Sequence, residues 1–105
     1  MVSLTYGFVG TDLDGVADAL APALGLQWEQ RESSFRGGNY FLCRRGAEEF
    51  ILQINWDTLD GEPFEDAPDV AVVLYASTGQ PDKVAASITG TPIGARAVLL
   101  KRMEY

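Results

Sequence analysis

Large apolar residues recur at alternate positions in one stretch of the chain, which is the spacing typical of a β-strand. In residues 50–57 they share one predicted face, formed by Phe50, Leu52, Ile54 and Trp56. We therefore predict a half-buried strand there, with Trp56 on its core side. Residues 70–75 are uniformly apolar, which predicts a strand covered on both faces. Further strands are expected over residues 2–9, 26–33, 40–44 and 95–103.

Two other stretches carry helical spacing. Apolar residues repeat at intervals of three and four from Leu13 to Leu24, which predicts an amphipathic helix. Thr11 is the expected N-cap, Pro22 should kink or end the helix, and Gly25 should close it. A second, shorter helix is predicted to start at Pro81, because proline is favoured in the first helical turn.

The predicted order of elements is β-α-β-β-β-β-α-β, in a single domain spanning residues 1–105. Three consecutive strands joined by short turns suggest an antiparallel meander. The economical arrangement is an α+β, two-layer sandwich, in which a mostly antiparallel sheet of five to six strands carries both helices. This resembles a ferredoxin-like plan with extra strands.

Composition agrees with one ordinary core: 47% of the 105 residues are hydrophobic and 22% are charged. The single cysteine, Cys43, excludes an intrachain disulfide and is expected to be a small buried residue in a reducing compartment. The longest apolar run is too short to span a bilayer, and residues 1–6 have no signal-like pattern. We therefore expect a cytoplasmic protein.

The residue types that most enzymes rely on are scarce. The chain has no histidine, which excludes a Ser-His-Asp site and argues against zinc. It has no phosphate-binding glycine loop, and two aspartate-rich segments depart from the EF-hand pattern. Glu48 and Glu49 are expected on opposite faces of a strand, so they would not act together. We predict no enzyme activity, no cofactor and no metal.

The distribution of charge is the most unusual feature. The net charge is −7, and residues 46–82 hold nine acidic side chains and no basic one. Six of the nine fall in a predicted loop over residues 57–69, which also carries Phe64. A solvated loop that merely aids solubility would explain this. An aromatic residue within an acidic rim is also a typical anchor for protein interfaces. The predicted partner-binding residues are Asp57, Asp60, Glu62, Phe64, Glu65, Asp66 and Asp69, with Tyr40 added because it follows a glycine turn.

This charge favours some partners over others. An acidic surface repels nucleic-acid phosphates and anionic lipid, so we expect neither direct nucleic-acid binding nor membrane binding. A cationic protein is the better candidate, because attraction between opposite charges speeds association to about 10⁸–10⁹ M⁻¹s⁻¹ at low salt. Nucleases present such cationic surfaces around their substrate channels.

Three stretches, residues 31–41, 49–55 and 60–63, resemble small bacterial immunity proteins. Those proteins are encoded beside polymorphic toxins, including those of contact-dependent growth inhibition. The resemblance implies a cytoplasmic protein that binds and neutralises a cognate toxin domain, often a nuclease. These families share no universal binding residues, so the partner-binding residues above rest on the charge argument alone.

Two alternatives of other classes stay open. The first is a small ligand-binding or regulatory domain that dimerises through its sheet. The second is an enzyme that uses only carboxylates. The oligomeric state is not predicted by the sequence.

Overall fold

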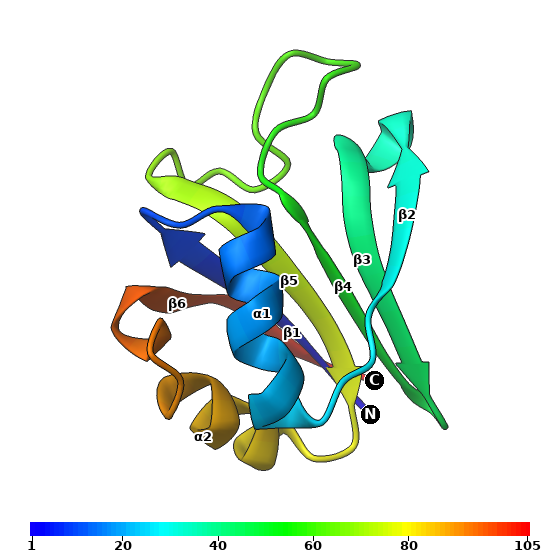
Figure 1. Ribbon diagram of the computed structural model, residues 1–105, viewed down its shortest axis with the longest axis vertical. Coiled ribbons are helices and arrows are strands. Elements are labelled where there is room, and N and C mark those ends of the chain that lie inside the picture. Colours follow the sequence, from blue (N-terminus) through cyan, green and yellow to red (C-terminus); the bar gives the residue numbers. More distant parts are fainter.

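All strands lie in one antiparallel sheet in the order β2-β3-β4-β5-β1-β6 (Figure 1). The computed structural model describes residues 1–105. The elements are β1 Val2–Val9, α1 Leu13–Leu24, β2 Glu29–Ser33, a short 3₁₀ turn η1 Ser34–Arg36, β3 Gly38–Arg45, β4 Glu48–Ile54, β5 Val70–Thr78, α2 Pro81–Thr89, a second 3₁₀ turn η2 Gly94–Arg96, and β6 Ala97–Glu104. The predicted α+β class and element order are confirmed.

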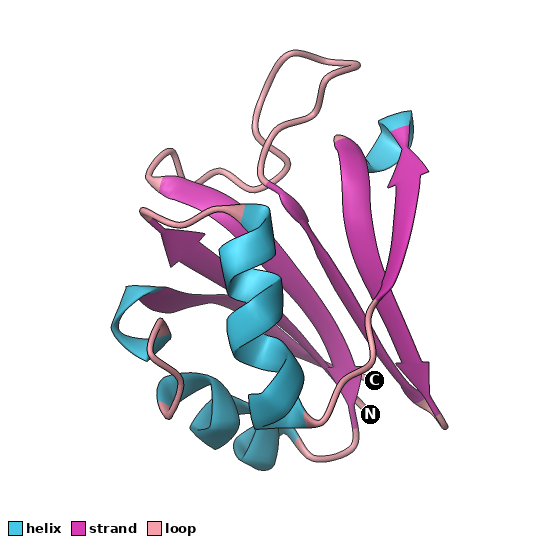
Figure 2. Cartoon of the chain, viewed as in Figure 1, coloured by secondary structure: helices cyan, strands magenta, loops and turns pink.

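Both helices cover the same face of the sheet, so the molecule has two layers (Figures 1 and 2). Alternate strand residues and the inner sides of the helices form the core between the layers, with Phe8, Leu20, Phe50, Leu74 and Ile88 buried in it. The strand order β6-β1-β5-β4, with its helices, follows the ferredoxin-like βαββαβ plan. The hairpin of β2 and β3 extends that sheet beyond β4.

Helix α1 has the predicted bounds, but its N-cap differs from the prediction. Its N-cap is Asp12, whose Oδ1 accepts a hydrogen bond from the N–H of Gly15 at 2.7 Å, whereas Thr11 has a buried hydroxyl with no partner. Pro22 does not end the helix, which continues to Leu24. The carbonyl that Pro22 leaves unpaired lies four residues earlier, at the exposed Asp18, where water can bind it. No helix is long and apolar enough to cross a membrane.

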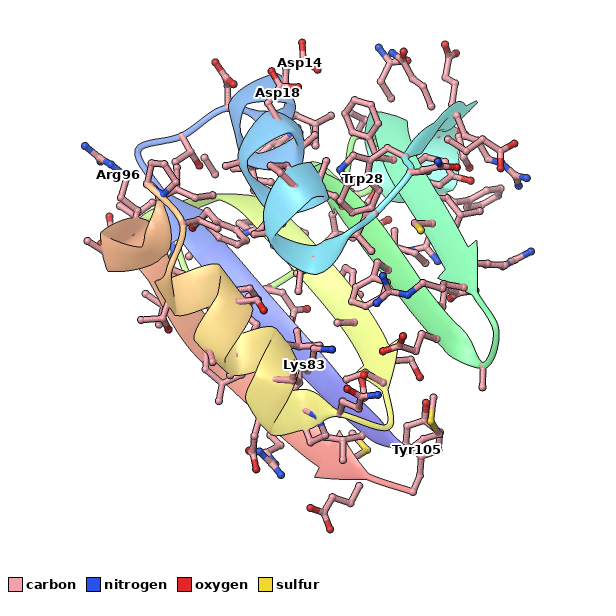
Figure 3. All side chains as sticks on the ribbon, turned by 60° about the horizontal axis from the view of Figure 1, so that its bottom comes forward. Asp14, Asp18, Trp28, Lys83, Arg96 and Tyr105 are labelled. Carbon is pink, nitrogen blue, oxygen red and sulfur yellow. The ribbon has the colours of Figure 1, made fainter.

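The segment after α1 becomes a strand only at Glu29, three residues later than predicted. Leu26 is buried in the core, and the indole Nε1 of Trp28 donates a hydrogen bond to the carbonyl of Ala17 at 3.0 Å (Figure 3). The ring of Trp28 also lies 6.0 Å from that of Phe41. Residues 26–28 therefore pack beneath α1, and only the polar residues that follow join the sheet.

The prediction for the end of β4 is wrong, whereas the prediction for β5 is correct. Strand β4 ends at Ile54, and Trp56 is 46% exposed, so its predicted place in the core is wrong. Strand β5 is covered on both faces as predicted, since the neighbouring residues Val72 and Val73 are both buried. Cys43 is buried, also as predicted.

Candidate functional site

The connection between β4 and β5 spans residues 55–69, and we call it the β4–β5 loop; its returning part packs on the sheet face that the helices leave open. Asn55 fixes its base from a buried position. The Asn55 amide Nδ2 donates to the carbonyls of Glu65 and Val70, both at 3.2 Å, and its Oδ1 accepts from the N–H of Glu65 at 2.8 Å. One side chain at the start of the loop therefore satisfies backbone groups at its returning end.

Glu65 holds the returning part of the loop against the sheet. Its side chain is only 11% exposed. One carboxylate oxygen lies 3.1 Å from Nζ of Lys101 on β6, and the other accepts a hydrogen bond from the hydroxyl of Tyr75 on β5 at 3.3 Å. Burial, reinforced by this carboxylate, raises the pKa of Tyr75 to about 12. The carboxylate of Glu65 is thus engaged within the chain.

The outer part of the loop is a closed turn. The N–H of Asp57 donates to the carbonyl of Glu62 at 2.8 Å, and the N–H of Gly61 donates to the carbonyl of Asp57 at 2.7 Å. The Asp57 carboxylate accepts from the N–H groups of Leu59 and Asp60 at 2.9 and 3.3 Å. Gly61 has φ +70°, a conformation that favours glycine at this turn. Asp57 therefore shapes the tip of the loop.

The remaining acidic side chains of the loop are exposed and form no ion pair: Asp60, Glu62, Asp66 and Asp69. Two large apolar residues are exposed beside them, Trp56 and Leu59. In Figure 1 the loop projects beyond the end of the sheet, on the same side as η1. The tip thus presents apolar and anionic groups together to solvent.

The turn η1 lies next to the base of the loop. A Cβ atom on Gly37, the residue that closes η1, would come within 2.7 Å of the Trp56 carbonyl oxygen, so only glycine fits there. Gly37 also has φ +78°. Phe35 on η1 is 78% exposed, the largest exposed fraction among the large hydrophobic residues. The exposed aromatic rings of Phe35 and Trp56 therefore come from two segments that touch.

A pocket of about 440 Å³ separates η1 from the loop on the face opposite the helices. Half of its lining residues are aromatic, and one is an arginine. The lining residues are Phe35, Tyr40, Phe64, Tyr75, Ile51, Gln53, Ser33 and Arg36. The guanidinium of Arg36 donates to Oε1 of Gln53 at 2.9 Å and lies 5.8 Å from the centre of the Tyr40 ring. It forms no ion pair with any carboxylate.

The predicted site residues thus fall into three groups. Asp60, Glu62, Asp66 and Asp69 are exposed on the loop, as a binding role requires. Phe64 and Tyr40 come together in the pocket, although they are distant in sequence. Asp57 and Glu65 instead support the loop from within.

Sequence reasoning missed four contributors to this region: Phe35, Arg36, Trp56 and Leu59. Phe35 stands before two glycines, in a segment already predicted to turn, and an aromatic residue in such a turn is a usable signal of exposure. Trp56 gave the opposite signal, because it continues the alternation of β4. No local pattern marks Arg36, whose position depends on the pairing of β3 with β4.

Outside the loop, the carboxylates at the start of β4 are paired within the chain. No group of three or more histidine, cysteine, aspartate or glutamate side chains is placed to hold a metal ion. Glu49 pairs with Arg44 at 2.9 Å, and Glu48 pairs with Arg45 at 3.1 Å. A hydrogen bond from the Thr78 hydroxyl, aided by Arg45, lowers the pKa of Glu48 below its usual value. Glu48 is thus held ionised, which does not suit a general acid.

No protein-family model and no curated protein sequence matches this chain.

Proposed function

We propose that this chain is an immunity-type binding protein, which holds a cationic toxin domain such as a nuclease through the tip of the β4–β5 loop and the adjoining η1. The observation that carries the proposal is the exposure of Trp56, Leu59 and Phe35 among unpaired carboxylates. Such residues are usually buried in a monomer, or isolated on its surface. Here all three belong to η1 and the β4–β5 loop, which lie at the same end of the sheet (Figure 1).

The composition of this surface fits protein recognition. Interfaces gain most of their binding energy from a few aromatic anchors, which are surrounded by polar groups that exclude water. Trp56 and Phe35 would be the anchors, and Asp60 and Glu62 would form the surrounding acidic rim. The internal support of the loop by Asn55 and Glu65 reduces the entropy lost on binding, because the loop is already ordered.

The charge of the loop supports a cationic partner. Unpaired carboxylates close together repel one another, which costs folding stability unless a partner neutralises them. A partner with lysine and arginine side chains around its active site would do so, and the long-range attraction would accelerate binding. The resemblance to immunity proteins, together with this charge, supports a toxin as that partner.

The proposal is tested with the protein encoded by the neighbouring reading frame, provided that it carries a basic C-terminal domain. The binding partner is that domain, and binding is measured at several salt concentrations. The double substitution Asp60→Lys and Asp66→Lys should lower the association rate by about tenfold or more and reduce its salt dependence. In co-expression, the double variant should protect growth less than the natural chain.

A matched double variant controls for net charge. Asp14→Lys and Asp18→Lys change the charge by the same amount but lie on α1, in the helix layer (Figure 3). This variant should keep nearly the natural association rate. Equal losses in both double variants would show that only total charge matters, and no binding by the natural chain to the basic domain would contradict the proposal.

A second candidate function, binding of a small molecule, is favoured by the pocket beneath the loop. Its single unpaired cation, Arg36, and its aromatic walls suit a compact ligand that joins an anionic group to a planar apolar body. Such a ligand would raise the melting temperature of the chain. Substituting Arg36→Gln would abolish that rise, whereas binding of a cationic protein through the loop tip would persist.

A further inference from the structure

The two edge strands of the sheet differ in their protection against pairing. Strand β2 shows only polar or charged side chains, and charged edge strands discourage association. Strand β6 is longer and exposes Val98, Leu99 and Met103, the last of them 63% exposed. Because β6 ends the sheet, half of its backbone N–H and C=O groups point away from β1 and have no strand partner.

We propose that β6 pairs with the β6 of a second copy of this chain, in antiparallel orientation, and so joins two sheets into one. In the proposed register Val98 lies opposite Met103 of the second copy, and Leu99 lies opposite its Arg102. This inference is independent of the proposed function. It rests on which face of the sheet each β6 side chain occupies and on the charges that β6 carries.

In the proposed register, side chains of the same sheet face lie opposite one another in the two copies. Val98 and Met103 pair with Gly7 and Ser3 of β1, on the face away from the helices. The register between β1 and β6 shifts at Leu100, so Val98 and Met103 share a face although they are five positions apart. A two-fold axis perpendicular to the sheet therefore brings Val98 opposite Met103 with matching faces.

The helix-covered face matches in the same way. Leu99 and Arg102 pair with Tyr6 and Leu4, whose side chains face the core. Arg102 agrees with this placement, since its guanidinium lies 3.6 Å from the carboxylate of Asp82 on α2. A register shifted by one residue would set a side chain from the helix face against one from the open face.

The charge pattern of β6 also favours this register. In the proposed register, Lys101 and Arg102 lie opposite Leu100 and Leu99 of the second copy, and Glu104 lies opposite its Ala97. Like charges placed directly opposite each other would destabilise the pair, and this register opposes none. A register shifted by two residues toward the carboxyl end would set Lys101 against Arg102 twice. The pattern therefore selects one full-length register.

A cross-link tests the register. The N–H of Tyr105 donates to the carbonyl of Met1, so the backbone groups of Met103, two residues earlier, also face β1. Val98 and Met103 would then form a pair without hydrogen bonds between copies, with Cα atoms about 4.5 Å apart, which suits a disulfide. The double variant Val98→Cys and Met103→Cys should form covalent dimers under mild oxidation. The single variant Val98→Cys should not.

A charge substitution tests the dimer itself by sedimentation velocity over a range of concentrations. Leu99→Lys would oppose Arg102 twice in the dimer and should raise the dimer dissociation constant about tenfold or more. The control Gln30→Lys introduces the same charge on the exposed edge of β2 and should leave the constant unchanged.

A monomeric natural chain at every concentration would overturn the proposal. So would a dimer that Leu99→Lys leaves intact, or a double-cysteine variant that does not cross-link. Circular dichroism establishes that each variant is folded, which Leu99→Lys should be because Leu99 is about half exposed.

Discussion

Both faces of the sheet contain buried residues, but these are buried by different means. The helices cover one face with apolar contacts, and residues such as Phe50 and Leu74 are fully buried there. The returning part of the β4–β5 loop packs on the other face, where Gln53 and Asn55 are almost as buried. Their amides are hydrogen-bonded, to Arg36 and to the loop backbone respectively.

This difference shows that equal burial does not imply equal energetics. On the helix face, stability comes from apolar area removed from water and from close packing. On the loop face it depends on whether buried polar groups find partners, since an unpartnered buried group costs about 1–3 kcal/mol. Both faces carry a group with a shifted pKa, since burial raises the pKa of Tyr6 on the helix face and that of Tyr75 on the loop face.

The largest expected effect is on the helix face. Phe50→Ala should lower the free energy of unfolding by about 3–5 kcal/mol, because it removes a fully buried ring and leaves a cavity. Phe35→Ala, which removes the same ring from an exposed position, should change it by less than about 0.5 kcal/mol. Urea unfolding measures both. Similar losses from the two variants would mean that Phe35 is also part of the folded core.

A smaller but more local effect is expected on the loop face. Asn55→Ala removes the bonds to the backbone of Glu65 and Val70 and should cost about 2–3 kcal/mol. It should also make the β4–β5 loop the first site of cleavage in limited proteolysis. Asn39→Ala, at an exposed position on β3, is the control and should change little. Unchanged cleavage of the Asn55 variant would mean that other contacts hold the loop.

The smallest effect at neutral pH, and the one that depends on pH, concerns Tyr75. Its pKa is raised from 10.0 to about 12, so the protonated phenol is favoured in the folded state. This contribution to stability is fully present below pH 10 and is lost as the pH rises toward 12. Tyr75→Phe should cost about 0.5–1 kcal/mol at neutral pH, for one lost hydrogen bond.

Between pH 10 and 12, the free energy of unfolding of the Tyr75→Phe variant should fall less than that of the natural chain. Unfolding curves measured across that pH range test this. Parallel losses in the two proteins would show that Tyr75 ionises as easily in the folded chain as in the unfolded one. Every other residue is the same in both proteins, so the difference between their curves isolates Tyr75.

The helix face was largely predictable from sequence. Alternation in β1 and β4 and the helical spacing of α1 identify residues such as Phe8, Leu20 and Leu52, because regular elements repeat their buried positions at fixed intervals. The errors are at element ends. Trp56 continues the alternation of β4, but Asn55 binds the loop backbone and the strand stops at Ile54.

The candidate site was predictable only in part. The excess of carboxylates in residues 57–69 is visible in the sequence, and four of them are exposed. The inward position of Glu65 is not visible, because Tyr75 and Lys101 are brought to it by the pairing of β5 and β6 with β1. Phe35 and Phe64 likewise share a pocket only after the β2–β3 hairpin has joined β4.

The sequence alone determined the class of fold, the order of its elements, the acidic loop and the absence of histidine chemistry. Local spacing and composition are enough for these, since each depends on residues close together in the chain. Tertiary structure decided which carboxylates stay exposed, which aromatic rings surround Arg36, and which edge of the sheet is left unprotected. These depend on strand order and on hydrogen bonds between distant segments, which no local pattern encodes.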